Sequence, residues 1–380
     1  MRRLTAILLA LLSFCGCLSK GDAAHHIYVL SFGVESGDTF AYRIVLLAAM
    51  PKAGSEEGAT LSTEVLAAEA RTLFEAIETL NAGLPMTLRF SRTALILLSE
   101  PLAREGEIER LLDFSLGALD IHSNVHVMVA GSDLKTLYEG LQNDADPSFT
   151  KTINNLDALA AQSGTVPDGR CRSVWEALGS DAFDLVLPYI GANDPNPKPD
   201  LLGGEAYPKI GGALVQSNVL GASVIGSAVF DGPRMVGTLS GWHTALLAMV
   251  RGTFSEGRTT FYLPGTGTVS VKLQTNRRTE VSVRDGTAQV RIRLKAVPEY
   301  PLSALSRDPT LQTTLEQTIE AELNRLFSAL SDAHADAMQF GTRELWQFPF
   351  GGEAGWKTRY ASLSASFAVH VRVLETGGAS

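Results

Sequence analysis

Apolar and polar residues alternate in pairs of short segments, and these pairs predict β-hairpins. Residues 27–34 and 40–50 flank Glu35–Asp38, whose glycine and aspartate suit a tight turn. Residues 222–230 and 234–240 flank an Asp-Gly-Pro sequence in the same way. Each pair therefore predicts two antiparallel strands joined by a turn.

The last third of the chain has the clearest pattern. Alternation over residues 268–275, 279–285 and 288–297 predicts three strands, and 363–374 predicts a fourth. A helix is predicted over 308–330, with an aspartate N-cap followed by proline at the first helical position. Its apolar stripe consists of Leu311, Leu315, Ile319, Leu323, Leu326, Phe327 and Leu330. This order predicts one layer of sheet with a long helix on its face.

Helical and extended segments alternate between the first hairpin and residue 192. Spacings of three and four residues predict helices over 64–81, 105–119, 133–142, 148–162 and 172–178. Short apolar runs predict buried strands over 93–100, 125–131 and 184–192. Such alternation indicates a mixed sheet with helices packed on it.

The proline-rich stretch 193–208 cannot join a sheet, because proline fixes φ and lacks an amide hydrogen. It is the best candidate for a domain boundary. We therefore expect an α+β, multidomain fold with mixed and antiparallel sheets, helices packed on them, and three domains. These are an N-terminal α/β domain (25–200), a middle domain with a hairpin and a short helix (201–264), and a C-terminal domain of three strands, a long helix and a strand (265–380).

The first sixteen residues are typical of a signal peptide. Arg2 and Arg3 precede an apolar run over 4–14, which is too short to span a bilayer. Gly16 then precedes Cys17, and a small residue before a cysteine at this place resembles a bacterial lipobox. We expect cleavage after residue 16 and attachment of a diacylglyceryl group to the Cys17 thiol.

Two acyl chains on Cys17 would hold a folded body at the membrane surface. Residues 17–24 form a short segment of mostly small and polar residues, and we expect it to be the lipidated tether. The alternative is ordinary secretory cleavage near Ala23, which would release a free protein. No later segment offers 18 uninterrupted apolar residues, so the lipid is the one anchor that we expect.

Composition narrows the possible partners. Cleavage after residue 16 would leave 364 residues, too many for a single core, and would change the net charge from −9 to −11. An acidic body is repelled by phosphates, so we expect no nucleic-acid partner. With Cys17 lipidated, Cys171 is the remaining thiol and can form no internal disulfide.

Motifs of catalysis are missing from the chain. There is no GxxxxGK[ST] loop and no HExxH, and Ser240 in Gly237–Gly241 does not have GxSxG spacing, so we expect it to be an N-cap. His122 and His126 would lie about 13 Å apart on an extended strand, too far to share a metal. Glu316 and Glu320 predict a solvated helix face, with a partner-docking face as the alternative. We expect no enzyme activity, no catalytic or metal-binding residues and no cofactor.

Four segments, in their order, are similar to the Ger(x)C lipoproteins, the C subunits of spore germinant receptors. Residues 29–51 resemble the opening hairpin of that family, and 72–114 its helix-strand-helix block with an LLSEPLA element. Residues 226–252 resemble its middle segment. Residues 336–377 match its C-terminal signature, with Asp336, Phe340, Gly341 and Trp356 in place. The likeness covers nearly the whole mature chain.

Two positions depart from the family pattern. Ser91 stands before Arg92 where the family often has histidine, and Gln339 replaces the usual glycine of the C-terminal signature. We interpret both as divergence within the family.

The resemblance implies a three-domain, non-catalytic lipoprotein on the outer face of the inner spore membrane. It implies assembly with two integral membrane subunits into a receptor for small nutrients. From a different class, a solute-binding lipoprotein that delivers a small molecule to a membrane transporter is the alternative. Such proteins usually have two doubly wound lobes, which the C-terminal pattern does not predict. A third hypothesis is a cell-envelope hydrolase, but the absence of the catalytic motifs searched for above makes it the least favoured.

Overall fold

The fold was taken from a computed structural model of the whole chain. It describes residues 26–51, 61–142, 153, 164–192, 199–202, 210–211, 222–263, 267–300, 310–347 and 355–374. The predicted signal peptide, Cys17 and the tether 17–24 lie outside the described residues.

The first sheet has nine strands in the order β10-β9-β7-β6-β5-β1-β2-β3, with β4 paired to β1. The strands are β1 (His26–Ser36), β2 (Tyr42–Pro51), β3 (Leu61–Ala70), β4 (Thr87–Arg89), β5 (Leu95–Ser99), β6 (His126–Ala130), β7 (Val186–Ala192), β9 (Ala222–Asp231) and β10 (Arg234–Ser240). Its centre, β1-β5-β6-β7, is parallel, and its two ends are antiparallel hairpins. Every residue of β5 and β6 is buried, as in parallel strands covered on both faces.

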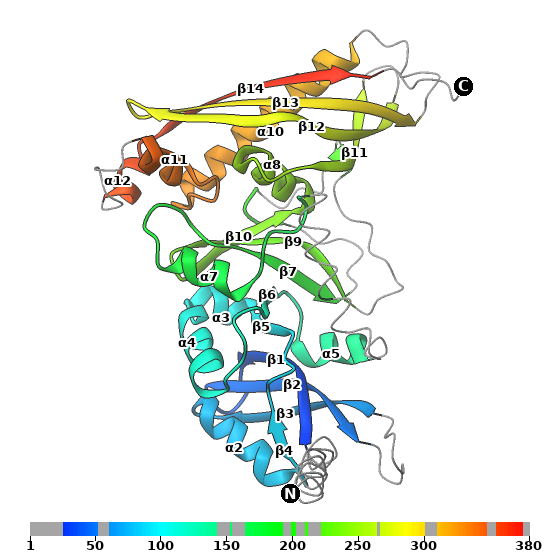
Figure 1. Cartoon of the computed structure of the whole chain (residues 1–380), viewed down its shortest axis with the longest axis vertical. Helices are drawn as coiled ribbons and strands as arrows, with labels where there is room; N and C mark the ends of the chain where they lie inside the picture. Colours follow the sequence, from blue (N-terminus) through cyan, green and yellow to red (C-terminus); the bar gives the residue numbers. More distant parts are fainter. Residues whose placement is uncertain are drawn as a thin grey trace, which may run out of the picture.

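Helices cover both faces of this sheet (Figure 1). On one face lie α2 (Leu73–Gly83), α3 (Glu100–Glu105), α4 (Ile108–Asp113) and α7 (Cys171–Leu178), and α4 runs on into the π-helix η2 (Phe114–Ala118). On the other face lies α5 (Leu134–Gln142), which buries Leu134, Leu137 and Tyr138. The result is a three-layer body at one end of an elongated molecule.

The second sheet has five strands in the order β14-β13-β12-β11-β8. They are β8 (Ile210–Gly211), β11 (Glu256–Leu263), β12 (Gly267–Arg284), β13 (Thr287–Tyr300) and β14 (Ser364–Val373). The long helix α10 (Leu311–Asp332) lies across one face, and all six leucines and isoleucines of its stripe are buried. The short helices α11 (Phe340–Gln347) and α12 (Trp356–Tyr360) lie near one end of the strands of this sheet, on the side toward the first sheet (Figure 1).

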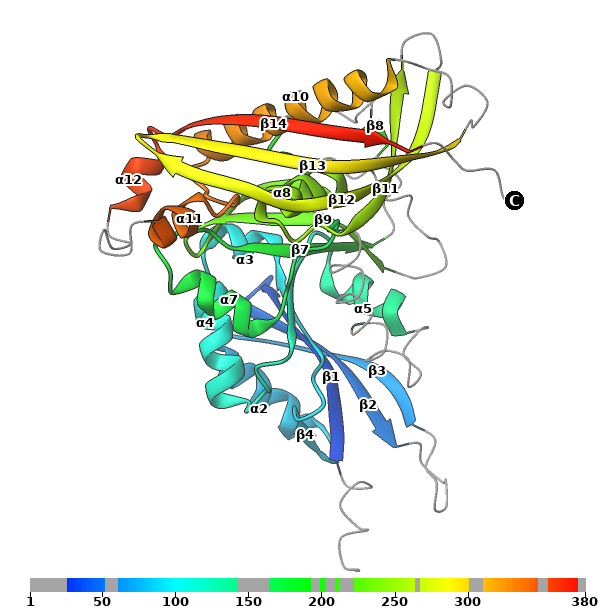
Figure 2. The same ribbon diagram turned by 45° about the horizontal axis from the view of Figure 1, so that its top comes forward.

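Helix α8 (Gly241–Arg251) lies between the two sheets (Figure 2). Every residue from Gly241 to Val250 is buried, because the helix packs on β9 and β10 on one side and on β12 and β13 on the other. Most of these residues are apolar, as expected for a helix buried on all sides, and the polar His243 and Thr244 are hydrogen-bonded. The two sheets therefore share one continuous core across α8.

Most predicted elements are confirmed, including both hairpins, the helices at 133–142 and 172–178, the long helix and the last strand. The long helix begins at Leu311 with Thr310 as its N-cap, so the predicted cap at Asp308 is wrong. The helix predicted over 148–162 lies outside the described residues except for residue 153. The helix predicted over 64–81 is wrong in its first half. Residues 61–70 form β3, which pairs with β2 along its whole length, and α2 begins only at Leu73. The helix predicted over 105–119 is α4 and η2, preceded by α3 from Glu100. Segments 268–275 and 279–285 are one strand, β12, with irregular register between Thr275 and Glu280.

The α+β fold with mixed and antiparallel sheets is confirmed, and the limits of its three domains stay a prediction. The predicted boundary near residue 201 does not separate the sheets. Hairpin β9–β10, which we expected in a middle domain, pairs through β9 with β7 of the first sheet.

The pair Glu316 and Glu320 has a role that its spacing did not predict. Glu320 Oε1 accepts a hydrogen bond from Val369 N at 2.8 Å, and Glu316 Oε1 accepts one from Val371 N at 2.8 Å. Both amides belong to β14, at the edge of the second sheet. The two carboxylates therefore occupy edge amides that could otherwise pair with another chain. Our prediction of a merely solvated face was wrong for these two residues.

Candidate functional site

Asp336 is the centre of a buried polar network where the two sheets meet. Its side chain is fully buried. Oδ1 accepts from Phe340 N at 3.0 Å, and Oδ2 accepts from Gly341 N at 2.8 Å and from Trp356 Nε1 at 3.0 Å. The carboxylate thereby caps α11 and ties α12 to it.

Gly341 is required for this close packing. A Cβ at this position would lie 2.2 Å from Ala182 O and 2.6 Å from Trp356 Nε1. Both distances are far below van der Waals contact, so a side chain would separate α11 from the loop before β7. The structure thus brings together the four residues of the C-terminal signature, Asp336, Phe340, Gly341 and Trp356, although they lie up to 20 residues apart.

A second carboxylate, Asp184, joins this network to the first sheet. Asp184 Oδ2 accepts from Asp336 N at 2.7 Å, and Oδ1 accepts from Gly232 N in the β9–β10 turn at 3.0 Å. Lys357 Nζ donates to both Asp184 oxygens at 2.6 Å and to Asp231 Oδ1 at 2.5 Å. We call Asp184, Asp231, Asp336, Trp356 and Lys357 the Asp336 junction.

Burial raises the pKa of Asp336 to about 6, and the nearby charge of Asp184 adds to the rise. The amide hydrogens of Gly341 and Phe340 and the indole of Trp356 stabilise the carboxylate and oppose it. Burial disfavours the ammonium of Lys357, but its hydrogen bonds to Asp184 and Asp231 outweigh this and raise its pKa. The junction is therefore a charged contact between sheets, held by paired groups.

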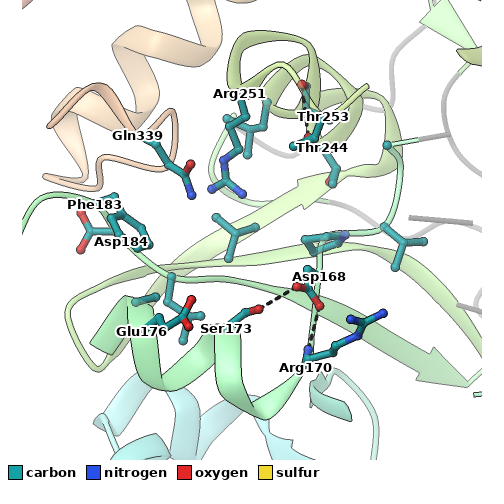
Figure 3. Close-up of a pocket in the computed structure, with 18 residues that line it drawn as sticks. Asp168, Arg170, Ser173, Glu176, Phe183, Asp184, Thr244, Arg251, Thr253 and Gln339 are labelled. Carbon is teal, nitrogen blue, oxygen red and sulfur yellow. Dashed lines mark hydrogen bonds between the residues drawn. The ribbon is translucent and has the colours of Figure 1, made fainter. Parts of the chain in front are cut away.

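A pocket of about 440 Å³ lies beside the junction, between α7 and α8 and next to β7 (Figure 3). We call it the α7–α8 pocket. Its apolar wall includes Ala177, Val186 and Leu247. Its polar lining includes Asp168, Arg170, Ser173, Glu176, Asp184, Thr244, Arg251, Thr253 and Gln339.

Arg251, the last residue of α8, points into this pocket (Figure 3). Its Nε donates to Ala337 O at 2.8 Å. Its Nη2 is buried and has no hydrogen-bond partner among the described residues. Burial lowers the pKa of Arg251 to about 10, and Asp336 partly opposes this, so the guanidinium remains charged at neutral pH. An unsatisfied donor of a buried cation is unusual in a folded protein.

Gln339 points toward the same pocket from the loop between Asp336 and α11 (Figure 3). Its φ is +61°, in the left-handed region that favours glycine. This explains the glycine that the family resemblance implies at this position. In this chain the position carries a side chain with both a donor and an acceptor.

Ser240 and His243 form a chain of hydrogen bonds with Glu322. His243 Nδ1 lies 2.9 Å from Ser240 Oγ, and Nε2 lies 3.3 Å from Glu322 Oε2. Ser240 Oγ also accepts from His243 N at 3.3 Å as the N-cap of α8, which confirms the predicted cap. Since Ser240 and His243 are both buried, this set joins α8 to α10 rather than facing a substrate.

Two other candidates, His126 and Cys171, lie where β6 meets the start of α7, and His126 forms an isolated β-bridge with Arg170 of the pocket lining. His126 is buried in β6, and Cys171 is a buried free thiol whose pKa burial raises to about 11. Within the described ranges, no three histidine, cysteine or carboxylate side chains are placed to hold a metal ion. Within the same ranges, no helix is long and apolar enough to cross a membrane.

Sequence reasoning missed Asp184, Arg251 and Lys357, which complete the junction and the pocket. No short motif marks them, because their main partners are distant in sequence: Asp184 lies 173 positions from Lys357 and 152 from Asp336, and Arg251 lies 86 from Ala337.

Comparisons with known proteins agree with the fold. Residues 24–192 match the family model described as the spore germination protein N-terminal domain. Residues 225–377 match the model described as spore germination B3/GerAC like, C-terminal. No curated protein sequence matches the chain. A solved structure titled "Crystal Structure of the GerBC protein" is similar in fold, with a TM-score of 0.51 and 13% sequence identity over 90% of this chain and 96% of that one.

Proposed function

The chain belongs to the Ger(x)C family of spore germination proteins, and from this premise we propose that it is a non-catalytic lipoprotein subunit of a germinant receptor. In this proposal Cys17 carries a diacylglyceryl anchor. The body lies on the outer face of the inner spore membrane and assembles with two integral membrane subunits. The observation that carries the proposal is the match of both family models, which together cover 24–192 and 225–377.

The position of β1 supports an anchor at one end of the molecule. His26, the first described residue, begins β1 at the end of the long axis farthest from the second sheet (Figure 1). It follows Cys17 by nine positions, and an extended chain of that length reaches about 30 Å. A lipid on Cys17 would therefore hold the β1 end near the membrane and leave the Asp336 junction farther out.

The absence of a recognisable catalytic set among the described residues supports a binding or structural role. Ser240 and His243, which come nearest to a nucleophile and its base, are buried. The solute-binding alternative gains no support from the fold, because the second sheet is largely antiparallel and has one long helix on it rather than a doubly wound lobe.

The test is Cys17→Ala, with Cys15→Ala as a matched control in the same segment. We expect Cys17→Ala to leave the membrane fraction and its spores to stop responding to one class of nutrient. Spores should still germinate with a trigger that bypasses nutrient sensing. Cys15→Ala should behave as the wild type.

Two results would contradict the proposal. Retention of Cys17→Ala in the membrane with normal germination would refute the anchor. Loss from the membrane with normal germination on every nutrient would keep the anchor and refute the receptor role.

A further inference from the structure

The α7–α8 pocket contains a cation, Arg251, with one donor nitrogen that lacks an acceptor among the described residues. Arg251 Nε is engaged by Ala337 O, while the buried Nη2 has no partner among the described residues. A guanidinium offers five N–H donors in a planar fork that matches a carboxylate. A buried polar group without a partner is destabilising, so an acceptor that enters the pocket would gain a strong, charge-assisted hydrogen bond.

The acidic residues of the pocket, in contrast, already have donors. Asp168 accepts from Ser173 Oγ at 2.7 Å and from Arg170 N at 3.0 Å (Figure 3). Glu176 pairs with Arg172 at 3.2 Å. Asp184 is held by Lys357 in the junction. The three carboxylates therefore already have hydrogen-bond donors, whereas Arg251 Nη2 is a buried donor without an acceptor among the described residues.

The same three carboxylates limit the charge of a ligand. A phosphate dianion would be repelled by Asp168, Glu176 and Asp184, whose three negative charges already exceed the two positive charges of Arg170 and Arg251 in the lining. A single carboxylate balances Arg251 alone. The wall of Ala177, Val186 and Leu247 suits a short apolar body next to it, and a volume of about 440 Å³ is in the range of small-molecule sites.

We propose that the α7–α8 pocket binds a small monocarboxylate with a short apolar body, whose carboxylate pairs with Arg251. A small rotation of the guanidinium toward the ligand would give Nη2 its acceptor. Gln339, which projects into the pocket from a left-handed backbone position, offers its amide as a second contact. This site does not depend on the receptor role, since it rests on the pocket alone.

The test uses three probes with the same four-carbon body on the purified full chain in detergent. Sodium butyrate carries a negative charge, butyramide is neutral and butylammonium is positive. Ligand-observed NMR titrations give a dissociation constant for each. We expect butyrate to bind at least tenfold more tightly than the other two.

Variants then assign the site. Arg251→Gln should weaken butyrate binding at least tenfold. Arg325→Gln is the matched control, since Arg325 Nη2 also donates to a backbone carbonyl, Leu202 O at 3.0 Å, but lies outside the pocket. It should change the dissociation constant less than twofold.

Three results would overturn the proposal. These are equal binding of all three probes, preference for butylammonium, or unchanged butyrate binding by a folded Arg251→Gln. If Arg251→Gln does not fold, the ranking of the three probes on the wild type decides. Germination does not enter the readout, so failure here leaves the proposed receptor role intact.

Discussion

Two partly buried cations, Lys357 and Arg251, lie at the same contact between the sheets and differ in how their charge is met. Lys357 binds Asp184, Asp231 and the carbonyl of His334. Arg251 binds one carbonyl, Ala337 O, and leaves a buried nitrogen unpaired. Removing one partner of a satisfied buried pair is costly, whereas removing an unsatisfied charge is not. The Asp336 junction therefore stabilises the contact between the sheets, whereas the α7–α8 pocket next to it has an unpaired donor that a ligand could bind.

The largest effect should come from the centre of the junction. Asp336→Asn should lower the free energy of unfolding by about 3 kcal/mol, because both carboxylate oxygens accept N–H donors. Whichever way the amide turns, its NH₂ group meets another donor. Urea unfolding at pH 7 measures the loss, with Asp332→Asn at the exposed end of α10 as the control. If Asp336→Asn and Asp332→Asn lowered the free energy of unfolding by the same small amount, the Asp336 junction would not stabilise the fold.

The pH dependence of stability tests the same carboxylate without replacing its neighbours. The pKa of Asp336 is about 6 in the folded chain and near 3.8 when unfolded. The folded state therefore binds the proton more tightly, and this contribution to stability is full below pH 4 and lost as the pH rises through 6. The loss is on the order of 2–3 kcal/mol. It should appear as the difference between the pH profiles of the wild type and Asp336→Asn, which cannot titrate there. Parallel profiles would contradict it.

The comparison of the two cations is tested by a matched pair of substitutions. Lys357→Met leaves Asp184 buried without its counter-charge, so we expect a loss of about 1–2 kcal/mol, reduced because Lys357 is itself 36% exposed. Arg251→Met removes one carbonyl contact but also an unpaired buried nitrogen, so its effect should stay within about 1 kcal/mol. Thermal unfolding of both variants gives the answer. A larger cost for Arg251→Met would mean that the pocket cation is structural.

Periodicity predicted the elements whose environment is set locally. The stripe of α10, the hairpins β1–β2 and β9–β10, and the strand β14 all follow the alternation or spacing of apolar residues. β3 was misread, because the three-residue step from Val65 to Ala68 fits a helix, whereas in the strand Leu66, Ala68 and Ala70 share one face and Val65 lies on the other. Residues 61–70 form a strand because they pair with β2, and the sequence of the segment alone does not show this pairing.

The candidate site could be predicted only in part, and only through the family resemblance. Asp336, Phe340, Gly341 and Trp356 came from the signature, and the structure adds why they are needed. Asp184 and Arg251 could not be found, because their roles arise when distant segments meet at α8. An aspartate after a helix and an arginine at a helix end are ordinary in any sequence.

Gln339 gives the smallest and most selective prediction about the pocket. Replacing it by glycine removes a side chain from a left-handed position with φ +61°, where a non-glycine residue costs about 1 kcal/mol. Gln339→Gly should therefore raise the free energy of unfolding by about 0.5–1 kcal/mol, measured by urea unfolding. The control is His334→Gly, which relieves a left-handed residue with φ +56° outside the pocket lining. If both variants gain stability but only Gln339→Gly weakens butyrate binding, the glutamine is retained for the ligand at the expense of the fold. If Gln339→Gly instead loses stability, the Gln339 side chain stabilises the loop, and the claim that it is retained for the ligand is wrong.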